Sequence, residues 1–482
     1  MSADGDPASS PSASSSGFHP RDRLKRELTL WDAVMLVVAS VVGSGIFFTP
    51  GRVAELLPHP GWILAAWLAG GAISLAGALA NAELSAMFPR AGGDYVYVRE
   101  GIHPAAGFLV GWLSFAIIFT GTIAAVAAAF AEGVAGPLGW GEGATVALAI
   151  AVTVLCSWLN YVGVRWGARA NNGTSVVKIA ALGAFVVAGP LFGAGDWSNV
   201  FAPALGASGA SGASGGGAGG ARAAAFALAM SPVLFSYLGW NASVFVASEI
   251  RDPRRNVPRS LFLGLAICTS VYLAVNVVYL YAIPVAALRG VGDAGSAAAV
   301  ALFGPVASRL VSAFVLVSIF GTLSATVLVG PRIAYAMALD GLFFGRLEGV
   351  TEGYQTPGSA IALQAAIASG LLLVLRSFPS ALDFTTFAIM LAAIADVAAL
   401  FRLRRREPAR ERPYRAWGYP WIPALYALAS AAIAASLAIA KPLEALVCGA
   451  MLVVGLLLYR AAARAQRARG AGAPLERGTA LD

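Results

Sequence analysis

The chain has few charged residues: Asp, Glu, Lys and Arg make up 12% of its 482 residues. A soluble domain carries about 25%, so this chain has too little charge to cover a water-exposed surface of the expected size. Hydrophobic residues make up 58% of the chain instead, and they are gathered in long runs. The shortage of charge excludes the soluble globular classes and indicates a helical membrane protein that crosses the bilayer many times.

Cysteine and histidine are equally scarce, with three residues of each. Cys156, Cys268 and Cys448 all fall inside hydrophobic runs, so we expect no extracellular disulfide framework, and no pair has the spacing of metal ligands. We therefore expect no metal and no cofactor. No Ser, Cys or His is grouped with a base in the way that nucleophilic catalysis requires, so we expect no enzymatic activity.

Twelve hydrophobic runs are long enough to cross a membrane, for which about 20 residues are needed. They cover residues 31–57, 62–87, 103–133, 143–163, 172–193, 223–250, 259–284, 302–337, 358–375, 380–401, 420–440 and 442–460. The fold class that they predict is an all-α membrane protein with twelve transmembrane helices.

The segments outside these runs are polar or of low complexity. Residues 1–27 form a Ser-, Pro- and Ala-rich tail without a cleavable signal peptide, and we expect it to be disordered. Residues 194–222 include a Gly/Ala/Ser-rich stretch that predicts a flexible extracellular loop. Residues 402–460 combine a basic cytoplasmic loop with the last two runs, and residues 461–482 form a second tail.

Basic residues are concentrated on one side of the predicted membrane. If the N-terminus is cytoplasmic, 26 of the 33 Lys and Arg residues fall in cytoplasmic segments. This positive-inside bias places both termini in the cytoplasm and the chain in the cytoplasmic membrane. A nucleic-acid-binding surface is the other interpretation of the net charge of +8, and it does not explain why the basic residues alternate with the spans.

Two of the runs are interrupted by glycine near their middle. The first interruption is residues 41–47 (VVGSGIF), and the second is residues 235–241 (FSYLGWN). Free backbone groups within a bilayer are tolerated where they line a cavity or hold something polar. Five crossings separate the two breaks, so they head blocks of opposite orientation, residues 28–193 and 223–401. This is the arrangement of transporters built from an inverted repeat.

The first break predicts a site for a carboxylate. An interrupted helix presents backbone N–H groups at the positive start of its second half, where an anion binds well. Gly43 and Gly45 let a solute approach the main chain, and Ser44 adds a hydroxyl group. The alternative is a packing surface, because small residues also bring transmembrane helices together. The matching second break favours the binding site.

The second break predicts the complementary site for an ammonium group. Carbonyl oxygens released near Phe235 and Leu238 suit a positive charge, so the two breaks together predict an α-amino acid as the ligand. Phe235, Tyr237 and Trp240 are candidates for covering or shaping the site. An aromatic side chain in a membrane helix more commonly faces lipid or packs in the interior, and its place at the break is what singles out Phe235.

Lys178 is the one lysine well inside a predicted span, since the other two stand at positions 25 and 441. A charged side chain in the bilayer is costly and usually functional. We expect its ammonium group beside the first break, where it replaces a coupling sodium ion or carries a proton. The alternative is a lysine that snorkels to the nearby end of its helix.

Four other charged residues in or near the spans are interpreted as structural. Asp396 precedes Arg402 by six residues, and we expect it to pair toward the cytoplasmic edge. Glu83 ends the second span, while Arg52 and Glu55 lie at the outer mouth.

Several longer motifs follow one another along the chain. They are Gly43-Ser44-Gly45-Ile46-Phe47 with Thr49-Pro50, Ala82-Glu83-Leu84, Phe88-Pro89-Arg90-Ala91-Gly92-Gly93-Asp94-Tyr95-Val96-Tyr97, Glu249-Ile250-Arg251-Asp252-Pro253, Asn256-Val257-Pro258-Arg259, Arg332 through Asp340-Gly341, Arg406-Glu407-Pro408 and Glu411-Arg412-Pro413-Tyr414-Arg415. In this order they resemble the amino acid–polyamine–organocation superfamily, in particular amino acid permeases similar to the L-type transporters. The resemblance covers about residues 28–459.

The resemblance implies a fold of the bacterial leucine-transporter type, with two inverted repeats of five helices, interrupted helices 1 and 6, and alternating access. It also implies that Ser44 and Gly45 bind the carboxylate of the substrate, and that Gly43 gives the substrate room.

The same resemblance implies roles for residues outside that motif. The carbonyl groups of Val41, Phe235 and Leu238 bind the substrate's amino group, and Phe235 is the gating aromatic. Lys178 stands near the sodium position of sodium-coupled relatives, and Thr322 contacts that lysine.

The chain departs from the family pattern in three places. Phe344 stands where proline is common, and Asp396 stands where apolar residues are usual. No cysteine lies between the third and fourth spans, so we expect no disulfide-linked glycoprotein subunit.

The sequence therefore predicts a secondary transporter that moves amino acids with neutral side chains across the cytoplasmic membrane, as an exchanger or with protons. The alternatives are a polyamine or organocation exchanger and a permease-like nutrient sensor without net transport. A polyamine exchanger would need a carboxylate in the pocket for the second ammonium group, and neither broken run supplies one. A sensor would be expected to have longer soluble extensions, and a channel would be expected to have a continuous pore.

Overall fold

The fold is described from a computed structural model that covers residues 24–201, 218–351, 353–375 and 378–468. Within these ranges the chain is helical, and a single isolated β-bridge joins Leu28 to Ile250. The predictions for most of the N-terminal tail, for the Gly/Ala/Ser-rich stretch and for the last residues of the C-terminal tail lie outside the described residues.

The helices follow one another with few long connections. In chain order the α-helices are α1 (Leu30–Val41), α2 (Gly45–Phe48), α3 (Pro50–Leu56), α4 (Pro60–Met87), α5 (Asp94–Gly101), α6 (Pro104–Leu113), α7 (Thr120–Leu138), α8 (Glu142–Tyr161), α9 (Val164–Phe192), α10 (Ala218–Ser236), α11 (Ala242–Phe245), α12 (Pro253–Ala282), α13 (Val285–Leu288), α14 (Ala294–Phe303), α15 (Pro305–Val329), α16 (Pro331–Leu339), α17 (Gly358–Leu375), α18 (Phe378–Arg406), α19 (Trp421–Ala440) and α20 (Pro442–Ala468). A π-helical turn, η2 (Ser114–Phe119), joins α6 to α7, and 3₁₀ turns occur at η3 (Trp197–Asn199), η5 (Ala247–Glu249) and η6 (Gly345–Glu348).

Ten helices in the described part of the chain are long and apolar enough to cross a membrane. They correspond to ten of the twelve predicted spans. The predicted spans 223–250 and 358–375 contain shorter apolar helices, Arg222–Ser236 and Gly358–Leu373. The count of twelve spans therefore remains a prediction.

Local sequence signals account for several helix starts. The Thr29 hydroxyl accepts a hydrogen bond from the Asp32 N–H, and the Asp32 carboxylate accepts one from the Thr29 N–H, which forms a capping box at the start of α1. His59 and His103 precede Pro60 and Pro104, and each imidazole accepts a backbone N–H of the first turn of its helix. Two of the three histidines thus cap helices at the edges of the spans.

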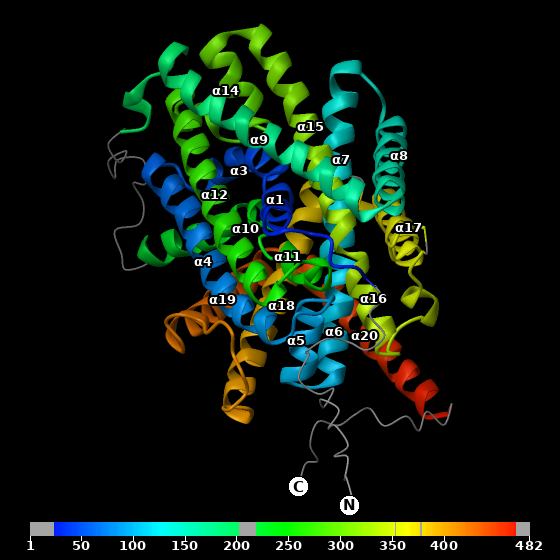
Figure 1. The fold of residues 1–482 in the computed structure, drawn as a ribbon. Coiled ribbons are helices and arrows are strands. Elements are labelled where there is room, and N and C mark those ends of the chain that lie inside the picture. The colour runs from blue at the N-terminus through cyan, green and yellow to red at the C-terminus, as the bar shows by residue number, and fades with distance from the viewer. Residues whose placement is uncertain (1–23, 202–217, 352, 376–377, 469–482) are drawn as a thin grey trace, which may run out of the picture.

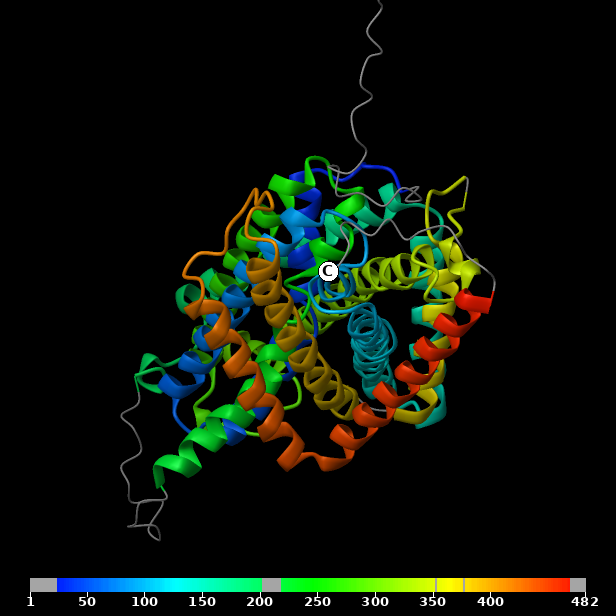
Figure 2. The same ribbon diagram turned by 90° about the horizontal axis from the view of Figure 1, so that it is seen from below.

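The bundle has a buried centre and an exposed rim. In the span Pro104–Leu138, 94% of the most apolar stretch of residues is buried, whereas the buried share is 11% in Ala445–Arg464 of α20. Seen from below, α19 and α20 run along the outside of the bundle (Figure 2). Figure 1 shows α5 and α6 at the lower end of the bundle and α14 at its upper end. We call the end of the bundle that contains α5 and α6 the lower end.

Candidate substrate site

Both predicted breaks are present in the structure. Helix α1 ends at Val41, and helical structure resumes with α2 at Gly45. The chain turns at Val42, whose ψ of 88° lies outside the helical range. The second break separates α10, which ends at Ser236, from α11, which begins at Ala242.

The two breaks lie against each other. A Cβ atom built on Gly45 would stand 2.6 Å from the Cα atom of Ser236, so only glycine permits this approach. The Thr49 and Ser236 hydroxyl oxygens are 2.9 Å apart and form a hydrogen bond between the two segments. On the other side, Gly239 has a φ of +97° and packs against Ser40. The glycines therefore serve both the turn and the contact between the breaks.

Lys178 fixes the first break from α9. Its Nζ donates to the carbonyl oxygens of Ala39 at 3.2 Å and Val42 at 2.7 Å, and to the Thr322 hydroxyl at 2.8 Å. An ammonium group has three N–H donors, so the three acceptors match it. The side chain is fully buried, and the snorkelling alternative is therefore wrong. Thr322 contacts the lysine, as the family resemblance implies.

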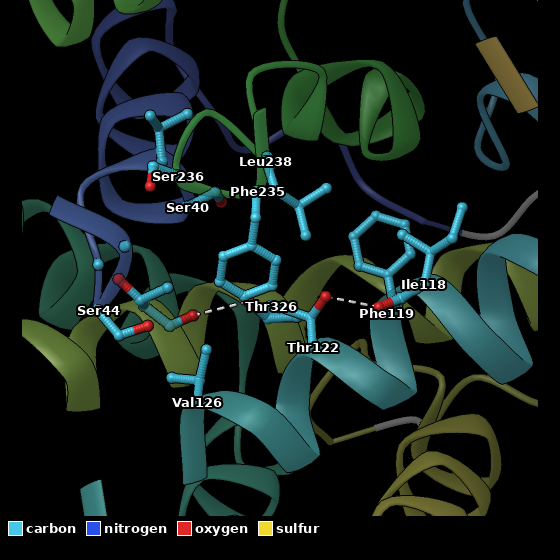
Figure 3. A pocket seen from close by; sticks show the side chains of 15 residues that line it. Ser40, Ser44, Ile118, Phe119, Thr122, Val126, Phe235, Ser236, Leu238 and Thr326 are labelled. Atoms are coloured by element: carbon cyan, nitrogen blue, oxygen red, sulfur yellow. Dashed lines mark hydrogen bonds between the residues drawn. The ribbon is translucent and has the colours of Figure 1, made fainter. Parts of the chain in front are cut away.

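The break cavity lies where the two interruptions meet α7 and α15. The space left free between these elements is small and partly open to solvent. In Figure 3, the Phe235 ring lies in the space between Ser44 and Thr122. The residues that line the cavity are Ser40, Val41, Gly43, Ser44, Gly45, Ile118, Phe119, Thr122, Val126, Phe235, Ser236, Leu238, Gly239, Thr322 and Thr326.

Most of the residues predicted for the substrate site line this cavity, and two predicted residues lie elsewhere. Val41, Gly43–Gly45, Phe235, Leu238 and Thr322 are among its lining residues. Lys178 lies behind the first break rather than in the cavity wall. Trp240 lines a second, neighbouring cavity instead.

Some carbonyl groups of the breaks have partners within the protein. The Phe235 carbonyl accepts the Leu238 N–H at 3.0 Å, and the Val41 carbonyl accepts the Tyr272 hydroxyl at 2.6 Å. A carbonyl oxygen has two lone pairs, so the Val41 carbonyl can accept one further hydrogen bond besides that from Tyr272.

Tyr272 of α12 is a site residue that the sequence did not reveal. Its hydroxyl lies 2.6 Å from the Val41 carbonyl oxygen and 2.8 Å from the Ser236 carbonyl oxygen, so one O–H group bridges the two breaks. The ring is fully buried and packs edge-on against Trp67 and Tyr237. The sequence shows only an aromatic residue in an apolar run, which gives no signal of this contact.

Removing this bridge tests its contribution to substrate binding. We expect Tyr272→Phe to lower the ratio of maximal flux to KM by roughly two- to tenfold, because a net hydrogen bond between neutral groups contributes about 0.5–1.5 kcal/mol. The measurement is concentration-dependent substrate flux into proteoliposomes. Tyr354→Phe, at a half-exposed tyrosine far along the chain, is the matched control. Equal kinetics for both variants would show that the bridge does not contribute.

A set of contacts joins the start of α1 to the segment after α11 and to α16. Leu28 pairs with the segment after α11 through two backbone hydrogen bonds, from its N–H to the Glu249 carbonyl at 2.9 Å and from the Arg251 N–H to its own carbonyl at 2.8 Å. Glu249 also forms a two-point ion pair with Arg332 of α16, with N–O distances of 2.9 and 3.2 Å, and both side chains are buried. These contacts therefore tie the two interrupted segments to α16.

The structure confirms one structural assignment and corrects another. Glu83 is buried at the end of α4 and pairs with Arg404 and Arg412, which is a structural role as predicted. The predicted pairing of Asp396 toward Arg402 is wrong. Asp396 is hydrogen-bonded to Asp94 and Asn81 instead, because six residues are about one and two-thirds helical turns and place Arg402 on another face.

Comparisons with known proteins identify relatives along most of the chain. The amino acid permease family matches residues 28–456. The serine/threonine exchanger SteT of Bacillus subtilis is 31% identical over 444 residues, which cover 91% of this chain and 97% of that protein. The human b(0,+)-type amino acid transporter 1 is 28% identical over 90% of this chain and 88% of its own length. The human large neutral amino acids transporter small subunit 2 is 29% identical over 85% and 75%, respectively.

Proposed function

The chain belongs to the amino acid permease family, and we propose that it moves amino acids with neutral side chains across the cytoplasmic membrane by alternating access. Members of the family are transporters and not enzymes, and the long apolar helices make this a multi-pass membrane protein. The proposal concerns the substrate, the site and the mode of transport.

The observation that carries the proposal is that two interrupted helices meet at one cavity. At the first break, residues 43–45 present the backbone N–H groups at the start of a new helical segment. The carboxylate of the substrate binds to these groups. The second break brings Phe235 and Leu238 to the same cavity, and we assign the substrate's ammonium group to their carbonyl oxygens. A zwitterion fits both ends at once, and an ion with a single charge fits only one.

The wall of the break cavity favours substrates with neutral side chains. Every residue that lines it is uncharged, so a charged side chain would enter the bilayer region without a partner, which costs several kcal/mol. Thr122 and Thr326 place hydroxyl groups on the far side of the cavity, and a Bacillus relative is named for serine and threonine exchange. Small neutral or hydroxylated side chains fit this wall best.

Alternating access requires the breaks to act as hinges between two gates. We assign the lower end to the cytoplasm because α5 lies there and the predicted topology puts the segment before residue 103 on the cytoplasmic side. The same topology puts Leu28 and Arg251 on that side, so their contacts and the Glu249–Arg332 ion pair form the inner gate. The Phe235 ring lies within the cavity (Figure 3), where it would cover a bound substrate. The blocks 28–193 and 223–401 are the two inverted repeats that move relative to each other.

Lys178 supplies a fixed positive charge at the first break. With its three N–H groups on the carbonyl oxygens of Ala39 and Val42 and on Thr322, it occupies the position of a coupling cation. This arrangement supports the sodium-replacement role over the proton-carrier role, and it leaves exchange or proton coupling as the modes of transport. We further propose that no disulfide-linked glycoprotein subunit is needed.

The proposal is tested by substrate flux in proteoliposomes that contain the purified protein. We expect saturable uptake of radiolabelled small neutral L-amino acids, faster than that of the D-enantiomers, and stimulated by the same amino acid inside the vesicles. Binding without flux would indicate a nutrient sensor instead. Flux of diamines in preference to neutral amino acids would indicate the organocation exchanger.

A further inference from the structure

A second cavity lies next to the break cavity and contains two acidic residues. It shares Ile118, Phe119 and Leu238 with the break cavity and extends toward α5, α18 and α19. We call it the acidic cavity. Its polar lining residues include Ser74, Asn81, Asp94, Ser114, Asp396 and Tyr426.

Asp94 and Asp396 come from distant parts of the chain and meet in this cavity. Asp94 is the first residue of α5, and Asp396 lies in the second half of α18. Their relative exposures are 4% and 3%, and their carboxyl groups are hydrogen-bonded to each other. An ionised carboxylate is only an acceptor, so a hydrogen bond between two carboxyl groups requires a proton on one of them.

The surroundings of the pair do not compensate its charge. The groups that face it in the described part of the chain are the Asn81 amide from α4, the Tyr97 hydroxyl from α5 and the Tyr426 hydroxyl from α19. In the described ranges, no lysine or arginine side chain contributes to the electrostatic environment of either carboxyl group. Two buried carboxylates a hydrogen bond apart cannot both ionise without such a partner.

The cavity also contains polar atoms without partners. One carboxylate oxygen of Asp94, one of Asp396, and the hydroxyl oxygens of Ser74 and Ser114 are buried and have no hydrogen-bond partner. Unpartnered buried polar atoms are uncommon in native proteins, so these four atoms mark the cavity as a polar site.

We propose that Asp94 and Asp396 together form a proton-binding site, and that one proton bound there crosses the membrane with each amino acid. This deepens the proposed function and rests on it. A zwitterion and one proton carry one positive charge per cycle. The proton enters from water on one side of the membrane, is held between the two carboxyl groups, and is released to water on the other side.

A proton explains the site better than a metal ion or the ammonium group of a substrate. No cluster of three or more potential metal ligands occurs among the described residues. The carboxyl groups bind each other rather than standing apart around a central cation. Burial raises the pKa of the Asp94 carboxyl above its usual range, which favours a bound proton.

The position of the pair connects it to the second break. Leu238, Trp240 and Asn241 of that break line the acidic cavity together with Phe245 of α11. The Gly92 N–H donates to the Phe245 carbonyl at 3.3 Å, two residues before Asp94. Movement of α11 during opening of the inner gate would therefore change the access of water to the carboxyl pair. This contact provides a physical route by which proton release follows substrate release.

The test compares proton-driven accumulation with exchange in the same proteoliposomes. For the unaltered protein, an inward proton gradient of one pH unit, with the membrane potential clamped at zero, should support a roughly tenfold accumulation of the substrate at one proton per amino acid. Asp396→Asn places an amide that donates to the Asp94 carboxylate, so the contact is kept without an exchangeable proton. We expect accumulation to fall to a ratio of about one, while substrate exchange at equal pH persists.

Controls separate this site from general effects of charge and folding. Glu411→Gln removes a carboxyl group that is 77% exposed and should keep gradient-driven accumulation. Asp94→Asn should behave as Asp396→Asn does. An infrared band of a protonated carboxylic acid, present in the unaltered protein and absent in both Asn variants, would report the shared proton directly.

Several outcomes would overturn the proposal. Accumulation by Asp396→Asn equal to that of the unaltered protein would place the proton elsewhere. Selective loss of lysine or diamine transport, with proton coupling intact, would make the pair a subsite for a cationic side chain. Stereoselective exchange without any response to a pH gradient would contradict the proton site but leave the proposed function intact. Absence of flux under every condition would contradict the proposed function itself.

Discussion

Replacing Lys178 with glutamine is expected to reduce amino acid exchange by roughly 100-fold or more. The lysine donates to two buried carbonyl oxygens of the first break and to Thr322. Glutamine is shorter, has two N–H donors and has no charge, so at least one of these acceptors loses its partner. An unsatisfied buried group costs about 1–3 kcal/mol, and loss of the charged donor adds to that cost, while 1.4 kcal/mol corresponds to a factor of ten.

The same variant separates the two roles considered for the lysine. If Lys178 replaces a sodium ion, the residual flux of Lys178→Gln should keep its response to a pH gradient, because the proton is carried elsewhere. If Lys178 carries the proton, that response should vanish. Lys25→Gln, at an exposed lysine before α1, is the matched control. Normal flux by Lys178→Gln with an unchanged pH dependence would remove the residue from the mechanism.

Replacing Gly45 with alanine is expected to abolish measurable transport. The added Cβ would stand 2.6 Å from the Ser236 Cα, a backbone atom that cannot move aside by rotation of a side chain. The two breaks would be forced apart at the point where we propose that the ends of the substrate bind. Overpacking of this kind costs about 1–3 kcal/mol in stability, and a displacement near 1 Å in a binding site costs about 100-fold in function.

Gly183 offers a control with the same chemical change. It lies in the interior of α9, and a Cβ built on it meets no atom within 4 Å. Gly183→Ala should leave flux unchanged and stabilise the helix by up to about 1 kcal/mol. Both variants are compared by thermal unfolding in detergent and by flux. Transport by Gly45→Ala with an unchanged KM would show that the close contact of the breaks is not required.

Glycine and polar residues inside long apolar runs were sufficient to locate the two breaks. A membrane helix interrupted in this way must satisfy its backbone elsewhere, so residues 43–45 and 235–241 stood out without any coordinates. Lys178 was predictable for the same reason, because a buried charge in the bilayer needs specific acceptors. The contact of Lys178 with Thr322 was implied by the family resemblance alone.

Residues whose role depends on helix rotation could not be predicted. Tyr272 and Thr122 lie in apolar runs with no periodic polar face, so the sequence does not show which way they point. Asp396 was assigned to the wrong partner because proximity in sequence was taken for proximity on the helix. Its true partner, Asp94, lies some 300 positions earlier on another element, and only the packing of α18 against α5 reveals the pair.

The central claim is that the two breaks hold opposite ends of one zwitterion. It is tested most directly by competition against uptake of a radiolabelled neutral L-amino acid, using the same compound without its carboxylate and the same compound without its amino group. The account predicts that the intact amino acid competes and that each truncated analogue competes at least 100-fold more weakly. Equal competition by either analogue would show that one of the breaks does not bind the substrate, and would contradict the account.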